Sequence, residues 1–346
     1  MLTADPGRPP APLLSTAWVP SSEAERLARS ARRGDLIRLA LGMFTSSEVW
    51  RELAPWDRHL LTVAAVSARS PEAVLCRETA LLIHGLPVVR TPKHVHIRTS
   101  RPERAGRDHG PTLTTGVPRL FRHEPALPRG TSRRTAREQH RAGTGLDSIR
   151  VALPPTARAP QDLRVRVDPL SLTVFDTVPR MPGGAALAVM DALAGRSSDD
   201  PPWETEAFVA QRPMLGPRRR EAQFDELAEL ADARSGSPGE SVSRWVLHRH
   251  GLATPSLQHP ITLRGGGTAY ADFAWVEAGV LGEFDGLTKY SGILDSRPPA
   301  DVVVAEKLRE DALRAQGWTV VRWVWSDLQN PERLVARLLR AGVPPA

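Results

Sequence analysis

The chain has 346 residues, of which 41% are hydrophobic and 25% are charged. This length allows two or three domains with cores of their own, and the composition is globular rather than disordered. No run approaches the roughly 20 apolar residues of a membrane-spanning helix, and the amino terminus lacks a signal-peptide pattern. A cytoplasmic protein without a membrane partner is expected. The single cysteine, Cys76, excludes an internal disulfide and a cysteine-built zinc site.

The net charge of +7 is unevenly distributed. Residues 1–220 hold 33 Lys and Arg against 22 Asp and Glu, whereas residues 221–346 hold 13 against 17. A basic surplus favours binding to a phosphate backbone, because counterions are released when Lys or Arg neutralises it. The alternative is a GC-rich genome that encodes arginine freely. Charge alone therefore leaves nucleic-acid binding and a codon bias both open.

The front of the chain predicts a small domain over residues 21–97, after a proline-rich leader over residues 1–20 that is expected to be disordered. The expected elements are helices over Glu23 to Arg33, Trp56 to Arg69 and Glu78 to His84, a strand or hairpin over Leu36 to Thr45, and an edge strand over His94 to Ile97. This order is that of a winged-helix domain. His94 and His96 share a strand face, but without a third ligand they are interpreted as surface residues.

Residues 98–234 predict a basic middle domain, since residues 98–166 hold fifteen arginines against six acids. The expected elements are weak strands over Leu113 to Thr115 and Arg119 to His123, a strand over Leu172 to Thr177, and helices over Ala185 to Ala194 and Arg218 to Ala233. A Ser-Gly-Ser-Pro-Gly stretch from Ser235 then predicts a linker or a sharp turn.

Residues 235–346 predict the order α–β–β–α–β–α. The expected elements are a helix from Ser237 to about His250, strands over Tyr270 to Val276 and Val280 to Asp285, a helix over Asp301 to Gln316, a buried strand over Trp318 to Trp325, and a final helix capped by Asn330. The glycine run between Arg264 and Thr268 lacks the pattern of a phosphate loop and predicts a hairpin turn.

Three carboxylates of this region are expected to converge. In a strand, residues two apart share a face, so Glu283 and Asp285 lie together. A two-residue turn at Ala278 and Gly279 places Asp272 opposite Asp285, and any even-length turn keeps all three carboxylates on one face, roughly 5–8 Å apart. Such a group favours a hard divalent cation, Mg²⁺ or Mn²⁺. The alternative is a solvent-exposed Asp272 and a turn that begins at Glu283.

Glu240 has two interpretations. Ser237 and Glu240 have the spacing of a capping box, with proline at the first helical position, and this explains the glutamate without any ligand. The other interpretation is a helix carboxylate that reaches the same metal ion.

From Glu240 onward the chain resembles the PD-(D/E)XK nuclease superfamily, and within it the branch of very-short-patch-repair-like endonucleases. The matching strings are GESVSRWVLHRHGL, PSLQHP, ADFAW, GEFDGLTKY, EKLREDALRAQGW and VVRWVW. The resemblance implies a restriction-endonuclease-like α/β/α module that cleaves phosphodiesters with Mg²⁺, with Asp272 and Glu283 as metal ligands. Asp285 stands where the superfamily has its lysine, so Lys289 and Lys307 are the candidate replacements. Lys307 could instead pair with Asp311 along a helix.

The front of the chain resembles the winged-helix region of AbiEi-type antitoxins from toxin–antitoxin systems. The matching strings are ARRGDLIRLALGMFT and RETALLIHGLP. The resemblance implies promoter DNA binding by the front domain and neutralisation of a cognate toxin by the middle domain. The alternative is that such short elements recur in many unrelated domains.

The predicted fold class is α/β, or α+β when the chain is taken as a whole. Two functions are consistent with these predictions. The first is a DNA-acting enzyme, a winged-helix reader joined to a Mg²⁺-dependent endonuclease module. The second is an antitoxin or transcriptional regulator whose nuclease-like module is a non-catalytic scaffold. The three carboxylates favour the first function, and Asp285 in the place of a lysine favours the second.

Overall fold

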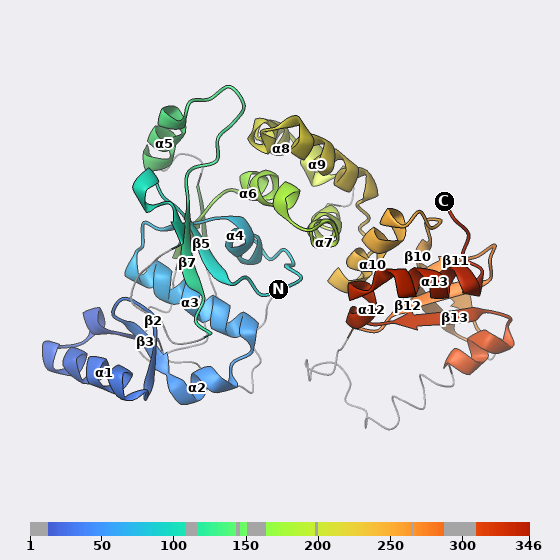
Figure 1. Ribbon diagram of the computed structural model, residues 1–346, viewed down its shortest axis with the longest axis horizontal. Helices are drawn as coiled ribbons and strands as arrows, with labels where there is room; N and C mark the ends of the chain where they lie inside the picture. The colour runs from blue at the N-terminus through green and yellow to red at the C-terminus, as the bar shows by residue number, and fades with distance from the viewer. Residues whose placement is uncertain are drawn as a thin grey trace. The chain divides into compact units, whose positions relative to one another are not determined.

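The computed structural model describes residues 13–107, 116–142, 146–150, 164–197, 200–264, 266–286 and 309–346. These residues form a mixed α/β structure with three β-sheets (Figure 1). None of their helices is long and apolar enough to cross a membrane. The chain divides into two compact units: Met1–Arg180 with Trp203–Phe224, here called unit 1, and Met181–Pro202 with Asp225–Ala346, here called unit 2.

Unit 1 begins with a small sheet and three helices. Their bounds are β1 (Leu14–Ser15), α1 (Ser21–Arg33), β2 (Leu36–Ala40), β3 (Met43–Ser46), α2 (Ser47–Glu52) and α3 (Pro55–Arg69), and the strand order is β1-β3-β2. Gly34, at φ 90°, ends α1 in the left-handed conformation that glycine favours. Leu13 is buried and β1 pairs with β3, so ordered structure begins inside the segment that was expected to be a leader. α3 contacts both β2 and β5, the latter a strand of the next sheet (Figure 1).

The second sheet of unit 1 has the order β6-β7-β5-β4-β9-β8. Its strands are β4 (Val74–Leu75), β5 (His94–Arg98), β6 (Gly106–Arg107), β7 (Arg119–His123), β8 (Asp147–Arg150) and β9 (Arg164–Val167). β5 is bonded to β4 on one side and to β7, in parallel, on the other. The prediction of an edge strand was therefore wrong, because the second neighbour comes from a segment more than 20 residues further along the chain. The strand expected over Leu113 to Thr115 lies outside the described residues.

The helices of unit 1 include one that was predicted as a strand. Their bounds are α4 (Arg77–Ile83), α5 (Arg133–Ala142), α6 (Leu170–Thr177), α8 (Glu206–Val209) and α9 (Arg218–Leu230), the last of which continues into unit 2. The Thr and Val residues of α6 favour a strand, but Phe175 packs 5.7 Å from Phe208 and 4.9 Å from Phe224, measured between ring centroids. These tertiary contacts outweigh a local preference that is worth at most about 1 kcal/mol.

Unit 2 has a sheet of the order β10-β11-β12-β13, in which β12 and β13 are parallel and the other pairs antiparallel. Its elements are α7 (Gly183–Ala194), α10 (Pro238–Arg249), β10 (Ser256–Thr262), β11 (Thr268–Trp275), β12 (Val280–Phe284), a helix over residues 309–315, β13 (Thr319–Trp323), α12 (Trp325–Gln329) and α13 (Pro331–Ala341). β10 was not predicted. The strand expected over Trp318 to Trp325 is shorter, because Trp325 begins α12, and of its residues only Trp323 is buried, so the prediction of a buried strand was wrong. β10 and β11 pair on both sides of the glycine run, so the predicted hairpin is confirmed.

The apolar packing of unit 2 holds α10 close to the sheet. The ring centroids of Phe273 and Trp323 lie 5.0 Å apart, and the Trp323 indole N–H donates to Ser243 Oγ of α10 at 2.8 Å. A Cβ added at Gly239 of α10 would lie 1.9 Å from the ring of Phe284, so only glycine permits this approach. The amino-terminal turn of α10, which carries Glu240, is thereby fixed beside β12.

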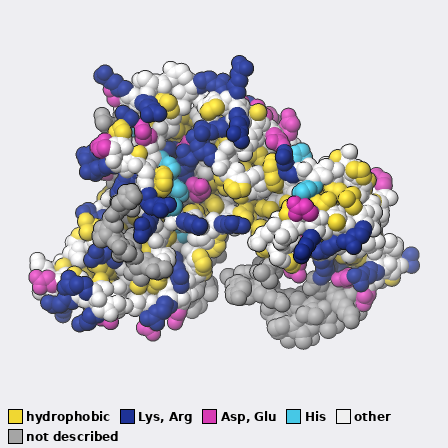
Figure 2. All heavy atoms as spheres, in the orientation of Figure 1, with side chains coloured by type: hydrophobic (Ala, Val, Ile, Leu, Met, Phe, Trp, Pro, Cys, Tyr) yellow, Lys and Arg dark blue, Asp and Glu magenta, His cyan; other side chains and the backbone are white. Residues whose placement is uncertain are grey.

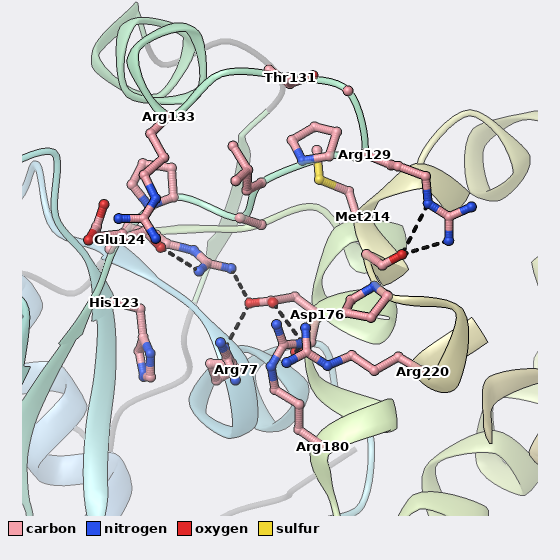
Figure 3. Close-up of a pocket in the computed structure, with 18 residues that line it drawn as sticks. Arg77, His123, Glu124, Arg129, Thr131, Arg133, Asp176, Arg180, Met214 and Arg220 are labelled. Carbon is pink, nitrogen blue, oxygen red and sulfur yellow. Dashed lines mark hydrogen bonds and ion pairs between the residues drawn. The ribbon is translucent and has the colours of Figure 1, made fainter. Parts of the chain in front are cut away.

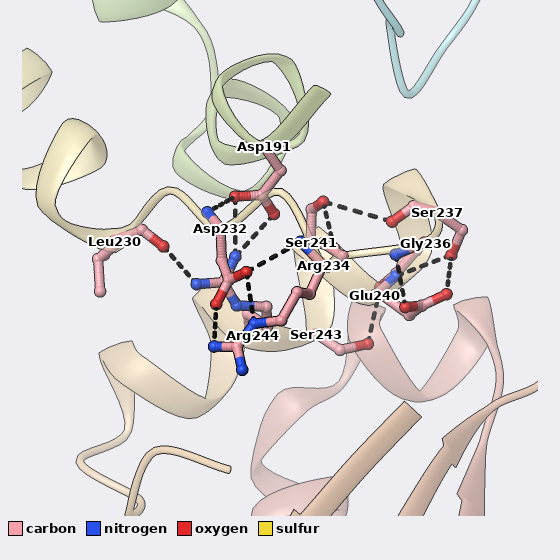
Figure 4. Close-up of polar contacts among 12 residues, drawn as sticks. Asp191, Leu230, Asp232, Arg234, Gly236, Ser237, Glu240, Ser241, Ser243 and Arg244 are labelled. Atoms are coloured by element: carbon pink, nitrogen blue, oxygen red, sulfur yellow. Dashed lines mark hydrogen bonds and ion pairs between the residues drawn. The ribbon is translucent and has the colours of Figure 1, made fainter. Parts of the chain in front are cut away.

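α7 holds α10 from a second direction. A Cβ at Gly183 would lie 2.1 Å from the Trp245 ring, which shows how closely the two helices pack. Arg244 of α10 donates to both carboxylate oxygens of the buried Asp191 at 2.8 Å, and the Asp232 N–H donates to the same side chain (Figure 4). Both bonds to Asp191 come from Arg244 Nη1, while Nη2 donates to Leu230 O, so the guanidinium ties α10 to α7 and to the end of α9.

Candidate functional site

A row of polar side chains crosses the four strands of the unit 2 sheet. The pairs on either side of Gln258 place it opposite Asp272, and the β11–β12 register, continued by one residue, places Asp272 opposite Glu283. Glu283 in turn pairs with Arg322 of β13. Since directly opposed residues share a face of a sheet, these four side chains lie in one row.

The turn between β11 and β12 differs from the prediction. It has four residues, 276–279, because Trp275 pairs with Val280. Gly279, at φ 64°, supplies the left-handed backbone that the longer turn requires. Four is still an even number, so Asp272 and Glu283 share a face as predicted, but Asp272 is opposite Glu283 rather than Asp285. Asp285 follows the end of β12, is exposed and donates its N–H to Trp323 O.

Asp272 is half-buried and accepts two hydrogen bonds. Its Oδ2 accepts from the Phe284 N–H at 2.9 Å, and its Oδ1 accepts from Gln258 Nε2 at 3.3 Å. Burial raises the pKa of the Asp272 carboxyl above its usual value, although these two bonds and the charge of Arg309 act in the opposite direction. The ionised form of Asp272 is therefore under-stabilised by its surroundings.

Glu240 has the capping role that its sequence position predicts. The Ser237 Oγ accepts from the Glu240 N–H and donates to Glu240 Oε1 at 2.8 Å, and the Gly236 N–H donates to Oε2 at 2.8 Å (Figure 4). The N-cap bond of the predicted capping box is present, but Glu240 accepts in return from the N–H of Gly236, one residue before the N-cap. Oε2 also accepts from Gln258 Nε2 at 3.0 Å. Burial and the neighbouring charge of Asp272 raise the pKa of Glu240.

Gln258, which the sequence did not single out, connects the two carboxyl groups. Its amide nitrogen lies within hydrogen-bond distance of both Glu240 Oε2 and Asp272 Oδ1. Gln258 has a positive φ of 47°. Among the non-glycine residues that the structure describes, only Arg77 also has a positive φ. Non-glycine residues in this region are strained and concentrate at functional positions. β10 was not predicted from the sequence, and without that strand the pairing of Gln258 opposite Asp272 could not be predicted.

Glu283 is buried and its two oxygens are taken by arginines. Oε1 lies 2.7 Å from Arg309 Nη2, and Oε2 lies 2.9 Å from Arg322 Nη2. Arg309 also donates to Tyr270 O at 3.1 Å, and Arg322 lies 3.3 Å from Glu310. Two guanidinium groups, neither of them predicted, therefore stand beside the expected metal ligand.

The donor set fits a divalent cation in part. The Asp272 and Glu240 carboxylates converge, and hard cations prefer such oxygen ligands. Glu283 would have to release at least one arginine contact to join them. In the described part of the chain, no three His, Cys, Asp or Glu residues are grouped closely enough to hold a metal ion. Lys289 and Lys307 lie outside the described residues.

In unit 1, the two histidines that were predicted to be surface residues, His94 and His96, form a cluster with His123. His96 Nδ1 lies 2.8 Å from His123 Nε2, and His94 faces His96 with ring centroids 5.9 Å apart. Burial lowers the pKa of His96 and of His123 to about 3. His94 and His96 are half-buried rather than fully exposed, because β7 pairs beside β5 and places His123 next to His96.

Two uncharacterized proteins of Mycobacterium tuberculosis, one from strain CDC 1551 / Oshkosh and one from strain H37Rv, are similar to this chain. Each is 36% identical over 156 residues, which cover 45% of this chain and 54% of the relative. The chain thus spans about half the length of the curated relatives it matches. No family model matches the chain. No solved structure matches it either.

Proposed function

We propose that this chain acts on nucleic acid as a metal-dependent endonuclease-like phosphodiester hydrolase. In this proposal unit 2 is a restriction-endonuclease-like module, and residues 21–97 are a winged-helix-like DNA-binding segment. The observation that carries the proposal is the convergence of Glu240 and Asp272 on the amide of Gln258. Two carboxyl groups with raised pKa values that share one hydrogen-bond donor are what a divalent cation would stabilise.

The row and its neighbours Glu240 and Arg309 then have these roles. Asp272 and Glu240 would hold Mg²⁺ or Mn²⁺, which when bound polarises a phosphoryl oxygen and makes a water molecule more acidic. Gln258 would orient both carboxylates through its amide. Arg309 and Arg322, which Glu283 holds in place, would bind oxygens of the scissile phosphate, because guanidinium groups match phosphate geometry.

The DNA-binding part of the proposal rests on the charge of unit 1. α1 carries four arginines against two glutamates, and Arg26 and Arg32 are exposed. Lys and Arg side chains are numerous on the face of unit 1 that is visible in Figure 2. Such a surface contacts phosphates without reading sequence, so it would deliver DNA to unit 2 rather than select a site.

A second candidate function is an AbiEi-like antitoxin or transcriptional regulator, with a cognate toxin as partner and a non-catalytic unit 2. The pairing of both Glu283 oxygens with arginines favours it. A glutamate held in this way serves the stability of the sheet without any metal.

Nicking of supercoiled plasmid separates the two functions. Wild type with Mg²⁺ or Mn²⁺ should nick the plasmid, and Asp272→Asn should lower the rate at least about 100-fold, because the metal loses a ligand charge. Glu277→Gln is the matched control: Glu277 is an exposed acid in the same hairpin. If wild type cleaves neither DNA nor RNA in the presence of metal but binds its own promoter, the endonuclease proposal is wrong and the regulator proposal is supported.

A further inference from the structure

Unit 1 contains a pocket that is distant in sequence from the carboxylate row. Its volume is about 660 Å³, within the size range of small-molecule sites (Figure 3). Two carboxylates, Glu124 and Asp176, line it together with six arginines. The arginines are Arg77, Arg98, Arg129, Arg133, Arg180 and Arg220.

The floor of the pocket is a buried ion cluster around Asp176. Asp176 Oδ2 lies 2.7 Å from Arg98 Nη2 and 2.8 Å from Arg77 Nε, and its Oδ1 lies 3.1 Å from Arg180 Nη1 (Figure 3). Asp168 neutralises Arg98 from behind at 2.6 Å. Three guanidinium groups therefore share two carboxylates, and the floor keeps a positive charge.

The rim adds positive charge to that floor. Arg220 of α9 is half-buried, and its side chain points toward Arg180 and Asp176 in Figure 3. Within the described residues this side chain makes no hydrogen bond or ion pair, whereas the Arg220 backbone N–H donates to Pro217 O. Burial, with repulsion from Arg77, Arg220 and Arg98, lowers the pKa of Arg180 to about 10. Arg133 stands exposed at the start of α5 on the same rim. Glu124 does not offset this charge, because Arg137 already pairs with it at 2.7 Å.

One wall of the pocket is apolar. It is formed by Ala126, Leu127, Pro128 and Met214. Leu127 is 41% exposed and lines the pocket, so its side chain can contact a ligand that enters it. An inorganic anion alone would leave this wall in contact with water.

The backbone at the floor is strained. Arg77 has a φ of 55°, a conformation that costs a non-glycine residue free energy of order 1–3 kcal/mol. Its guanidinium is directed at Asp176 from the first turn of α4. The fold therefore holds this charge in place before any ligand arrives, which lowers the entropic cost of binding.

We propose that this pocket binds a nucleoside phosphate with a terminal phosphate group, the phosphate against Arg180 and Arg220 and the nucleoside against Leu127 and Met214. A terminal phosphate is nearly a dianion with three acceptor oxygens, whereas each phosphodiester of a nucleic-acid backbone carries a single charge. The unneutralised arginines match the dianion. The ligand site is separate from the proposed nuclease site and does not depend on it.

Calorimetric titration of the full chain with ADP at fixed ionic strength tests the proposal. Wild type should bind ADP and should not bind adenosine. Arg220→Gln should weaken ADP binding roughly 10- to 100-fold, because one charge-assisted contact is lost. The fold should not change, since the Arg220 side chain has no partner to lose among the described residues. Arg104→Gln, an exposed arginine of the same unit outside the pocket, should leave binding unchanged.

The two ends of the ligand are tested separately. Leu127→Ser should weaken ADP and leave pyrophosphate unaffected, and equal loss for both ligands would overturn the assignment of the nucleoside to the apolar wall. Unchanged ADP affinity in Arg220→Gln, or absence of ADP binding by wild type, would overturn the proposal. Displacement of ADP by unphosphorylated duplex DNA would assign the arginines to a nucleic-acid backbone instead. Asp272→Asn should still bind ADP, which separates this result from that of the nuclease site.

Discussion

The proposed metal site of unit 2 rests on two carboxyl groups whose burial disfavours their charge. Glu240 and Asp272 share one amide donor, and burial is the largest influence on the pKa of each. Both groups also accept backbone hydrogen bonds, and those of Glu240 serve the start of α10, so the bonds offset part of the cost of burial. In the proposed function, a bound cation would offset the rest.

The raised pKa values predict how pH and metal act on stability. Between the usual carboxyl pKa and the raised one, the folded state binds more protons than the unfolded state, so stability falls as pH rises through that window. Mg²⁺ or Mn²⁺ should reverse the loss at pH 7, by about 2.7 kcal/mol at 100 times the dissociation constant. At pH 4, partial protonation of Asp272 and Glu240 should weaken the metal effect.

Thermal unfolding at both pH values measures this effect without any substrate. Asp272→Asn should be more stable than wild type at pH 7 in the absence of metal, and should lose the response to Mn²⁺. Glu277→Gln should respond like wild type. A metal-induced stabilisation that survives in Asp272→Asn would remove this pair as the metal site.

At the scale of elements, the periodicity of the sequence predicted which residues share a face of a strand, whereas the pairing register between strands depended on the tertiary structure. The alternation of Tyr270 to Val276 was enough to place Asp272 and Glu283 on one face. It did not show the length of the turn, so the partner of Asp272 was predicted wrongly as Asp285. Arg309, Arg322 and Gln258 could not be found in this way, because their positions depend on a helix and a strand that are distant in sequence.

Other elements followed the same division. α7, α10 and α13 were predicted well because their sequence signals are local, although only α10 has the expected side-chain cap and Asn330 does not cap α13. α6 was predicted as a strand because its Thr and Val residues favour one, whereas contacts distant in sequence, including those of Phe175 with Phe208 and Phe224, hold it as a helix. The histidines of β5 were interpreted as exposed for a similar reason, since β7 lies in a separate segment.

The contact between α10 and β12 can be tested as an element-scale property. Gly239→Ala would place a methyl group against Phe284, and relief of that overlap should cost about 1–3 kcal/mol of unfolding free energy. It should also move Glu240 away from Gln258 and weaken metal binding. Gly195→Ala is the matched control, because the nearest atom to its added Cβ is 3.7 Å away. Urea unfolding measures the first effect, and equal stability of the two variants would contradict the packing argument.

At the scale of the whole molecule, unit 1 should lose more stability in acid than unit 2. Burial lowers the pKa of several unit 1 histidines: about 4 for His59 and His140, about 3 for His96 and His123. A histidine with a lowered folded pKa contributes stability above its unfolded value, near 6.5, and that stability is lost as pH falls toward the folded pKa. In unit 2, protonation of Glu240 and Asp272 acts with the opposite sign.

Differential scanning calorimetry between pH 7 and pH 4 measures this divergence. The transition of unit 1 should move to lower temperature as pH falls, whereas that of unit 2 should fall less or rise. His96→Gln should make the stability of unit 1 less dependent on pH. The variant lacks one histidine that the unfolded state protonates in acid and the folded state does not. Its stability at pH 7 should drop, since the ring contacts with His123 and Phe121 are lost. Parallel acid dependence of both transitions would show that other carboxylates, rather than these buried groups, control the pH response of the molecule.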